Sequence, residues 1–130
     1  MKTVQVTETN FKDAVASGIV LLDFWAAWCG PCRAFAPIFE AAAARHPDVV
    51  FGKVDTEAES GLAAAFQIRS IPTLMVFRDN ILLAAQPGMM PAQVLDEMIA
   101  KVKALDMDEI RRELETEKAA AARDVAVAGR

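Results

Sequence analysis

Apolar residues recur along the chain in patterns that predict alternating strands and helices. The nearly continuous apolar run Ile19–Trp25 is typical of a parallel strand that is buried on both faces. Shorter apolar or alternating runs predict four more strands, at residues 3–6, 49–55, 73–77 and 81–85. The first of these alternates polar and apolar positions, which favours an edge strand. The last two are joined by Arg78-Asp79-Asn80, a tight turn that suits a hairpin because Asp and Asn tolerate positive φ.

Between these strands the apolar positions return every three or four residues, as in a helix that buries one face. Residues 31–45 form the clearest case, in which Pro31 suits the first turn and Pro37 should introduce a kink. Further helices are predicted over residues 10–16, over residues 56–66 with a capping box at its start, and from Pro91 onward. The last of these has one apolar stripe, made of Val94, Leu95, Met98, Ile99 and Val102.

This order of elements predicts an α/β fold. We expect a central mixed sheet of about five strands flanked by helices on both faces, with a parallel centre and an antiparallel hairpin at one edge. A length of 130 residues suits one compact domain, which we place at residues 1–105. Residues 106–130 are predicted to form a charged, helical C-terminal extension, with residues 125–130 disordered.

The extension begins with a capping-box pattern, Asp106-Met107-Asp108-Glu109, and Asp108 could pair with Arg112 one turn later. Its apolar stripe is narrow, so burial of this stripe alone cannot stabilise an isolated helix. The extension could pack back on the domain, pair with another copy of the chain, or extend into solvent.

Composition excludes several classes of function. The chain is 54% hydrophobic and 25% charged with a formal net charge of −4, which argues against nucleic-acid binding. Its first residues show no signal-peptide pattern, and its apolar runs are too short to span a bilayer, so we expect a cytoplasmic protein without membrane contact. Two cysteines without a second pair of ligands make a zinc site improbable, and so short a Cys-x-x-Cys loop adds little stability.

The segment Trp28-Cys29-Gly30-Pro31-Cys32 lies between the buried strand and a helix N-terminus. The first turn of a helix has unpaired N–H groups and a positive partial charge, and both stabilise an anion. Cys29 should therefore favour its thiolate form and attack a disulfide. Cys32 lies one turn inside the helix, where it should be more buried and act as the resolving thiol.

Asp23 is a carboxyl group within the buried strand. Burial without a partner should raise its pKa toward neutrality, so that it could accept the proton of Cys32. The alternative is a structural carboxyl satisfied by a hydrogen bond.

The segment from Phe24 to Cys32, together with Ile71-Pro72-Thr73 downstream, resembles the thioredoxin family over roughly residues 3–105. The resemblance implies a thioredoxin fold and a redox-active Cys29–Cys32 pair, with Lys53 near the buried Asp23. It also implies that Pro72 follows a cis peptide bond and faces the cysteines. Gly30 and Pro31 match the reducing members of the family.

The resemblance further implies a flat, apolar docking patch around the reactive sulfur. Its residues would be Trp28, Gly30, Pro31, Ile71, Pro72, Pro87 and Gly88. The backbone of Ile71 could pair with an extended target segment as an added strand. Trp25 is expected in the core, and His46 on the surface.

The function implied is that of a thioredoxin-type protein-disulfide reductase. It would bind no cofactor or metal and would receive electrons from NADPH through thioredoxin reductase. Its partners would be that reductase and disulfide-containing proteins, and the chain would be a monomer. One alternative is a thioredoxin-like chaperone or assembly module that uses the apolar rim and the C-terminal helix. Another is an isomerase or oxidase, although Gly30-Pro31 argues against oxidation.

Overall fold

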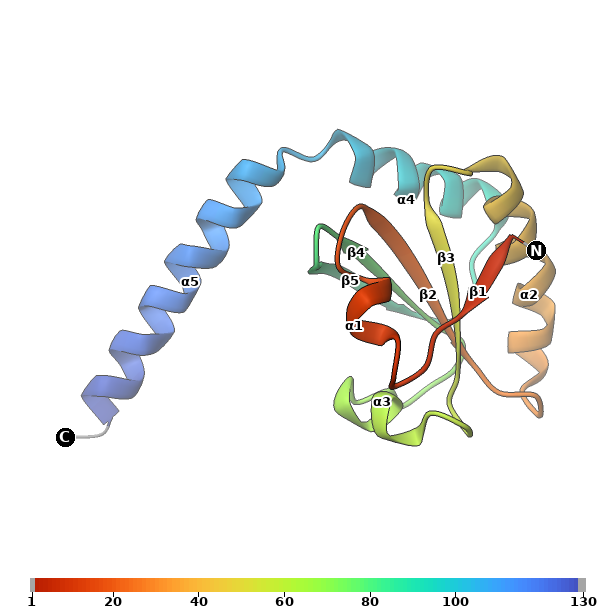
Figure 1. Cartoon of the computed structure of the whole chain (residues 1–130), viewed down its shortest axis with the longest axis horizontal. Helices are drawn as coiled ribbons and strands as arrows, with labels where there is room; N and C mark the ends of the chain where they lie inside the picture. The colour runs from red at the N-terminus through yellow and green to blue at the C-terminus, as the bar shows by residue number, and fades with distance from the viewer. Residues whose placement is uncertain (1, 129–130) are drawn as a thin grey trace.

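A five-stranded sheet forms the centre of the computed structural model, which describes residues 2–128 (Figure 1). Its strands are β1 (Thr3–Gln5), β2 (Ile19–Trp25), β3 (Val50–Asp55), β4 (Thr73–Arg78) and β5 (Ile81–Pro87). The helices are α1 (Phe11–Ala14), α2 (Gly30–Arg45), α3 (Ser60–Ala65), α4 (Ala92–Ala104) and α5 (Met107–Ala128). The predicted α/β fold with a mixed sheet and a C-terminal helix is confirmed.

The strands lie in the order β1-β3-β2-β4-β5. The strand pairs β1–β3 and β2–β3 are parallel, whereas β2–β4 and β4–β5 are antiparallel. The expectation of a parallel centre was therefore only half right, because the central strand β2 is parallel to one neighbour and antiparallel to the other. The β4–β5 turn has φ values of 53° at Asp79 and 68° at Asn80, which confirms the predicted hairpin.

Side chains of β2 alternate between two apolar cores, one on each face of the sheet. Leu21 packs with residues of α2 and α4 in one core, whereas Leu22 and Phe24 pack with residues of α1 and α3 in the other. This two-sided burial explains the continuous apolar run. On α4, Leu95, Ile99 and Val102 are buried, but Val94 is 44% exposed, so the predicted stripe was one residue too wide.

The predicted capping box at residues 56–59 was wrong. The hydroxyl of Thr56 donates to the carbonyl oxygen of Trp25 at 3.0 Å, and the carboxylate of Asp55 accepts from the N–H groups of Glu57 and Ala58. These contacts close a turn after β3, and α3 begins only at Ser60 without a side-chain cap. The turn brings Glu57 to the end of the sheet at which β2 leads into α2.

His46 is also less exposed than predicted. Its side chain is 19% exposed, and its ring nitrogen Nε2 lies 2.8 Å from the carboxylate of Asp96 on α4. The ring also stacks on Phe51. His46 thus joins α2 to α4 at the end of the sheet away from the cysteines.

Helix α5 begins as the capping pattern predicts, with the Asp106 carboxylate accepting from the N–H groups of Asp108 and Glu109. The predicted pair between Asp108 and Arg112 is absent among the described contacts, because Arg111 makes the contact with Asp108 instead. The helix continues through residue 128, so residues 125–128 are helical rather than disordered. Residues 129–130 lie outside the described part of the chain.

Candidate active site

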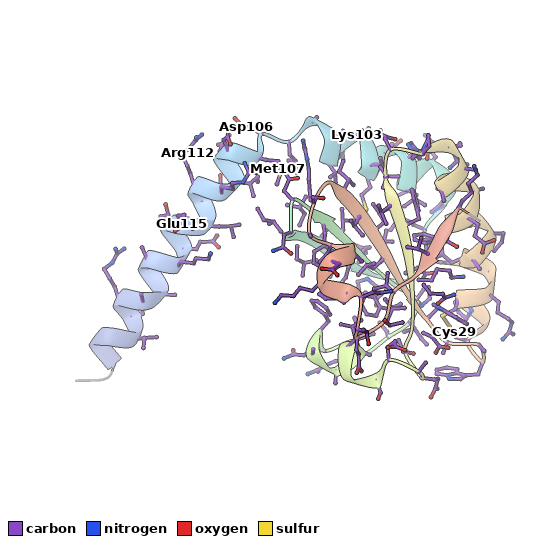
Figure 2. All side chains as sticks on the ribbon, viewed as in Figure 1. Cys29, Lys103, Asp106, Met107, Arg112 and Glu115 are labelled. Carbon is purple, nitrogen blue, oxygen red and sulfur yellow. A yellow bond between two sulfur atoms is a disulfide. The ribbon has the colours of Figure 1, made fainter. Side chains whose placement is uncertain are left out.

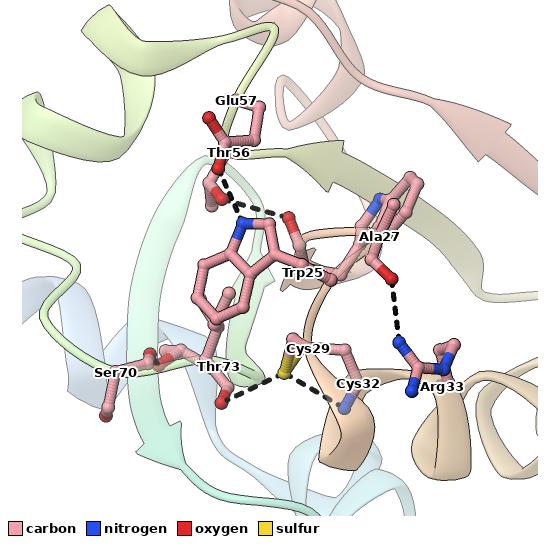
Figure 3. The surroundings of a disulfide bond; sticks show 11 residues. Trp25, Ala27, Cys29, Cys32, Arg33, Thr56, Glu57, Ser70 and Thr73 are labelled. Atoms are coloured by element: carbon pink, nitrogen blue, oxygen red, sulfur yellow. Dashed lines mark hydrogen bonds between the residues drawn. A yellow bond between two sulfur atoms is a disulfide. The ribbon is translucent and has the colours of Figure 1, made fainter.

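Cys29 and Cys32 form a disulfide at the N-terminus of α2 (Figure 3). Cys29 is the N-cap residue, and its Sγ accepts a hydrogen bond from the backbone N–H of Cys32 at 3.2 Å. This N–H is one of the donors that the first helical turn leaves unpaired, so Sγ of Cys29 occupies a position that stabilises negative charge. Pro31 lies in the first turn, as predicted. Proline has no backbone N–H, and at this position the helix loses no hydrogen bond as a result.

The two cysteines are nearly equally covered in the disulfide form. Cys29 is 4% exposed and Cys32 is 2% exposed, so the predicted difference in burial is small in this state. The geometry still distinguishes them. Sγ of Cys29 is the sulfur that accepts the helical N–H, and it lies beside the loop that precedes β4.

That loop contains a cis peptide bond between Ile71 and Pro72, which the family resemblance had implied. The carbonyl oxygen of Ile71 lies 3.6 Å from Sγ of Cys29. On the other side of the loop, the N–H of Gly88 donates to the carbonyl oxygen of Pro72 at 2.8 Å. Residues 29–32 and 71–72 therefore meet at this sulfur, and Gly88 is hydrogen-bonded to the second of these segments.

Asp23 is fully buried in β2, and within the described structure neither carboxylate oxygen has a hydrogen-bond partner. The alternative interpretation, a carboxyl group satisfied by a hydrogen bond, therefore finds no protein partner among the described residues. Burial raises the pKa of Asp23 to about 7, and the charge of Lys53 partly opposes this rise. Lys53 is the register partner of Asp23 on the adjacent parallel strand β3.

Trp25 closes β2 on the same face as Asp23 and is half-buried against the cluster that contains both cysteines. The ammonium group of Lys53 lies 5.1 Å from the centroid of the Trp25 ring. A cation at this distance is attracted to the ring face. Lys53 thus lies between an aromatic ring and a buried carboxyl group, and Trp25 is mainly a packing residue, as predicted.

Trp28 is 68% exposed. Its indole N–H donates to the carboxylate of Glu57 at 2.6 Å, which orients the ring. Arg33 donates to the carbonyl oxygen of Ala27 at 2.9 Å and so ties the loop before Cys29 to α2. The sequence analysis missed Glu57 and Arg33, because only tertiary contacts give them a role beside the motif.

A hollow of about 400 Å³ lies beside Trp28. Its lining includes Trp28 and Ile71, which were predicted, and other residues which were not: Thr56, Ala63, Ile68, Arg69 and Ser70. Pro87 and Gly88 are exposed as well, and Gly88 has a φ of +90°. A residue with a Cβ rarely adopts this conformation, so the backbone geometry itself favours glycine at position 88.

In the part of the chain that the structure describes, no helix has both the length and the apolar content needed to cross a membrane. Nor do three or more His, Cys, Asp or Glu side chains gather there in a group that could hold a metal ion.

Comparisons with known proteins agree with this site. The thioredoxin family model matches residues 2–101. A relative from Streptomyces coelicolor that carries a thioredoxin name is 50% identical over 120 residues, which cover 92% of this chain and 90% of the relative. Thioredoxin from Staphylococcus saprophyticus is 41% identical over 102 residues, covering 78% of this chain and 98% of its own.

A solved structure shows the same fold. Thioredoxin from Malassezia sympodialis superposes with a TM-score of 0.66 at 30% identity, covering 75% of this chain and 89% of that one. The family match, the relatives and the cysteine pair at the helix N-terminus all lead to the same assignment. This chain belongs to the thioredoxin family and is a thiol-disulfide oxidoreductase of the protein-disulfide reductase type.

Proposed function

We propose that Cys29 is the nucleophile and Cys32 the resolving thiol. The thiolate of Cys29 attacks one sulfur of a target disulfide, forming a mixed disulfide and releasing the other target sulfur as a thiolate, which takes a proton from water. Cys32 then loses its proton and attacks Sγ of Cys29, which releases the second target thiol and leaves the Cys29–Cys32 disulfide. The observation that carries this proposal is the hydrogen bond from the Cys32 N–H to Sγ of Cys29 at the start of α2.

Asp23 is the proton acceptor for Cys32 in this proposal, and Lys53 tunes it. A carboxyl group with a pKa of about 7 is partly ionised near neutral pH, where it can take a proton from a thiol and return it to water. The charge of Lys53 opposes the effect of burial and so keeps the pKa of Asp23 from rising further.

We assign substrate docking to the surface formed by Trp28, Gly30, Pro31, Ile71, Pro87 and Gly88, with the buried Pro72 beneath it. The backbone of Ile71 lies beside Sγ of Cys29, so a target segment paired there as an added strand would bring its cysteine to this sulfur. Trp28, exposed and held by Glu57, would cover the target on one side.

This assignment predicts that Trp28→Ala lowers kcat/KM for insulin reduction by about tenfold, mainly through KM, because an exposed aromatic anchor is lost. The rate with a small aromatic disulfide, which cannot span the surface, should change little. Glu57→Gln is the matched control, since it keeps an acceptor for the indole N–H. Equal losses with both substrates would mean that Trp28 acts on the cysteines rather than on docking.

We further propose that a thioredoxin reductase recharges the protein with electrons from NADPH, in the cytoplasm, as part of cellular electron transport and redox homeostasis. Residues 1–105 would form the reductase domain and residues 106–130 the extension. The exposed docking surface supports the role of a reductase partner, because the disulfide must be open to a second protein in each cycle.

A coupled assay tests this electron source. With NADPH, a bacterial thioredoxin reductase and insulin, we expect catalytic NADPH oxidation that requires all four components. Omitting this protein, or replacing it with the Cys29→Ser/Cys32→Ser variant, should abolish the signal. A glutathione-based system that supported turnover while thioredoxin reductases did not would reject the proposed partner. The reduction potential of the Cys29–Cys32 pair can be measured by equilibration with glutathione. A potential as high as that of disulfide oxidases would favour the oxidase alternative instead.

A further inference from the structure

Helix α5 extends away from the domain instead of packing on it (Figures 1 and 2). Within the described structure, its hydrogen bonds and ion pairs beyond Arg111 all stay inside the helix. They join Thr116 to Arg112 and Lys118 to Glu115. The helix comprises 22 residues and is therefore about 33 Å long. Most helices in proteins are stabilised by packing an apolar face against other elements, and the projecting part of α5 lacks such packing within its own chain.

The first turn of α5, by contrast, is held on the domain. Met107 is buried at 7% exposure, and Arg111 binds Asp79 in the β4–β5 turn at 3.1 Å. Just before the helix, Arg78 donates to the backbone carbonyl oxygens of Val102 and Leu105. These contacts fix the direction in which α5 leaves the domain. Folding α5 back on its own domain would require breaking them.

Four of the apolar positions along α5 are spaced symmetrically. Ile110, Leu114, Ala121 and Val125 follow one another at intervals of 4, 7 and 4 residues, a spacing that reads the same in both directions. At 100° per residue these four positions lie within about 60° on one face. The midpoint of the pattern falls between Glu117 and Lys118, which carry opposite charges.

We propose that this face binds α5 of a second copy of the chain, in antiparallel orientation, around a two-fold axis between Glu117 and Lys118. In this register Ile110 of one copy meets Val125 of the other, Leu114 meets Ala121, and Glu117 meets Lys118. Each contact occurs twice by symmetry. Val125 is 72% exposed in the single chain, so pairing would remove apolar surface from water.

The parallel alternative is disfavoured by charge and by size. It would place Glu117 against Glu117 and Lys118 against Lys118, and it would bring both domains to the same end of the helix pair. Antiparallel pairing places the two domains at opposite ends. Cys29 lies on the side of the domain away from α5 in Figure 2, so both disulfides stay accessible in the dimer. This dimer replaces the monomer expected from the sequence.

The dimer should be weak and reversible, because two of the four apolar positions are not large: Ala121 and Val125. The interface would fall near or below the roughly 1,200 Å² typical of small specific interfaces. We therefore expect dissociation constants on the order of tens of micromolar. Sedimentation equilibrium of the full chain between about 1 and 300 µM covers that range.

Two variants with the same charge change test the face. Leu114→Asp should raise the dissociation constant by about tenfold or more, since it places a carboxylate on the apolar stripe of both copies. Thr116→Asp, on the opposite face of α5, should leave it unchanged. Circular dichroism checks that both variants keep the helix, and the insulin-reduction rate per chain should stay the same in both. A monomer at every concentration, or a dimer that Leu114→Asp does not weaken, overturns the proposal.

Cysteine cross-linking tests the orientation in the Cys29→Ser/Cys32→Ser background. Ile110→Cys and Val125→Cys chains should cross-link when mixed, because the two positions face each other in the antiparallel pair. Neither chain should cross-link with itself, since like positions would lie about 22 Å apart along the axis. Self-cross-linking of either chain would show parallel pairing and reject the proposed arrangement.

Discussion

Replacing Cys29 by serine is expected to lower the rate of insulin-disulfide reduction by on the order of 10³-fold or more, to the rate without catalyst. A hydroxyl at this position ionises far too weakly to attack a disulfide, whereas the N-terminus of α2 stabilises a thiolate there. The fold should survive, because the short loop between positions 29 and 32 adds little stability through chain entropy. The insulin assay with dithiothreitol as reductant measures the effect.

Cys32→Ser is the informative comparison. This variant keeps the attacking thiol but lacks the resolving one, so it should accumulate mixed disulfides with its targets that survive non-reducing electrophoresis. Mass spectrometry of these adducts would name the targets. If Cys29→Ser trapped targets and Cys32→Ser did not, the two proposed roles would be reversed. If the double serine variant kept full biological activity, the chaperone or assembly alternative would be favoured.

Asp23→Asn is expected to make the protein more stable above neutral pH while making it a slower enzyme. Burial raises the pKa of Asp23 from 3.8 to about 7, so between these values the folded state binds more protons than the unfolded state. Stability of the wild type should therefore fall as pH rises from about 4 to about 7, and then level off. The difference of about three pKa units corresponds to about 4 kcal/mol as an upper value.

An uncharged amide at position 23 does not titrate, so the stability of the variant should not fall in this way as the pH rises. Urea unfolding of the oxidised protein at pH 4 and pH 8 measures the difference. We expect variant and wild type to differ least at pH 4, and the variant to gain up to about 4 kcal/mol relative to the wild type on going to pH 8. Equal pH dependence in both proteins would show that Asp23 does not carry the raised pKa.

The same variant should reduce insulin about tenfold to a hundredfold more slowly near pH 7, because Cys32 loses its proton acceptor. A gain in stability together with a loss of rate separates a catalytic effect from damage to the fold. An unchanged rate would reject the proton-acceptor role and leave Asp23 without a catalytic function.

Much of the fold could be predicted from the local sequence. The apolar run of β2, the alternation in β1 and the Asp79-Asn80 turn each depend on periodicity or on backbone preference, and both properties act within a few residues. Two of the errors arose where a side chain had a partner from elsewhere in the chain. Thr56 bonds Trp25 instead of capping α3, and His46 is covered by Asp96 of α4. Such partners are up to 50 residues distant in the sequence, and no local pattern encodes them.

The active site divides in the same way. Its chemical groups are visible in the sequence, because two cysteines one helical turn apart and a carboxyl group in an apolar strand are unusual enough to predict their chemistry. Their arrangement is not visible there. Only the fold brings Ile71 beside the sulfur, leaves both oxygens of Asp23 without a partner among the described residues, and places Glu57 against Trp28.

The sequence by itself determined the order of the elements, the cysteine pair at a helix start and the symmetric spacing within α5. These properties follow from covalent order and from local preferences. The tertiary structure decided the mixed pairing around β2, the lack of a hydrogen-bond partner for Asp23 among the described residues and the direction in which α5 leaves the domain. Each of these depends on burial and on contacts between distant segments, and such contacts exist only once the chain has folded.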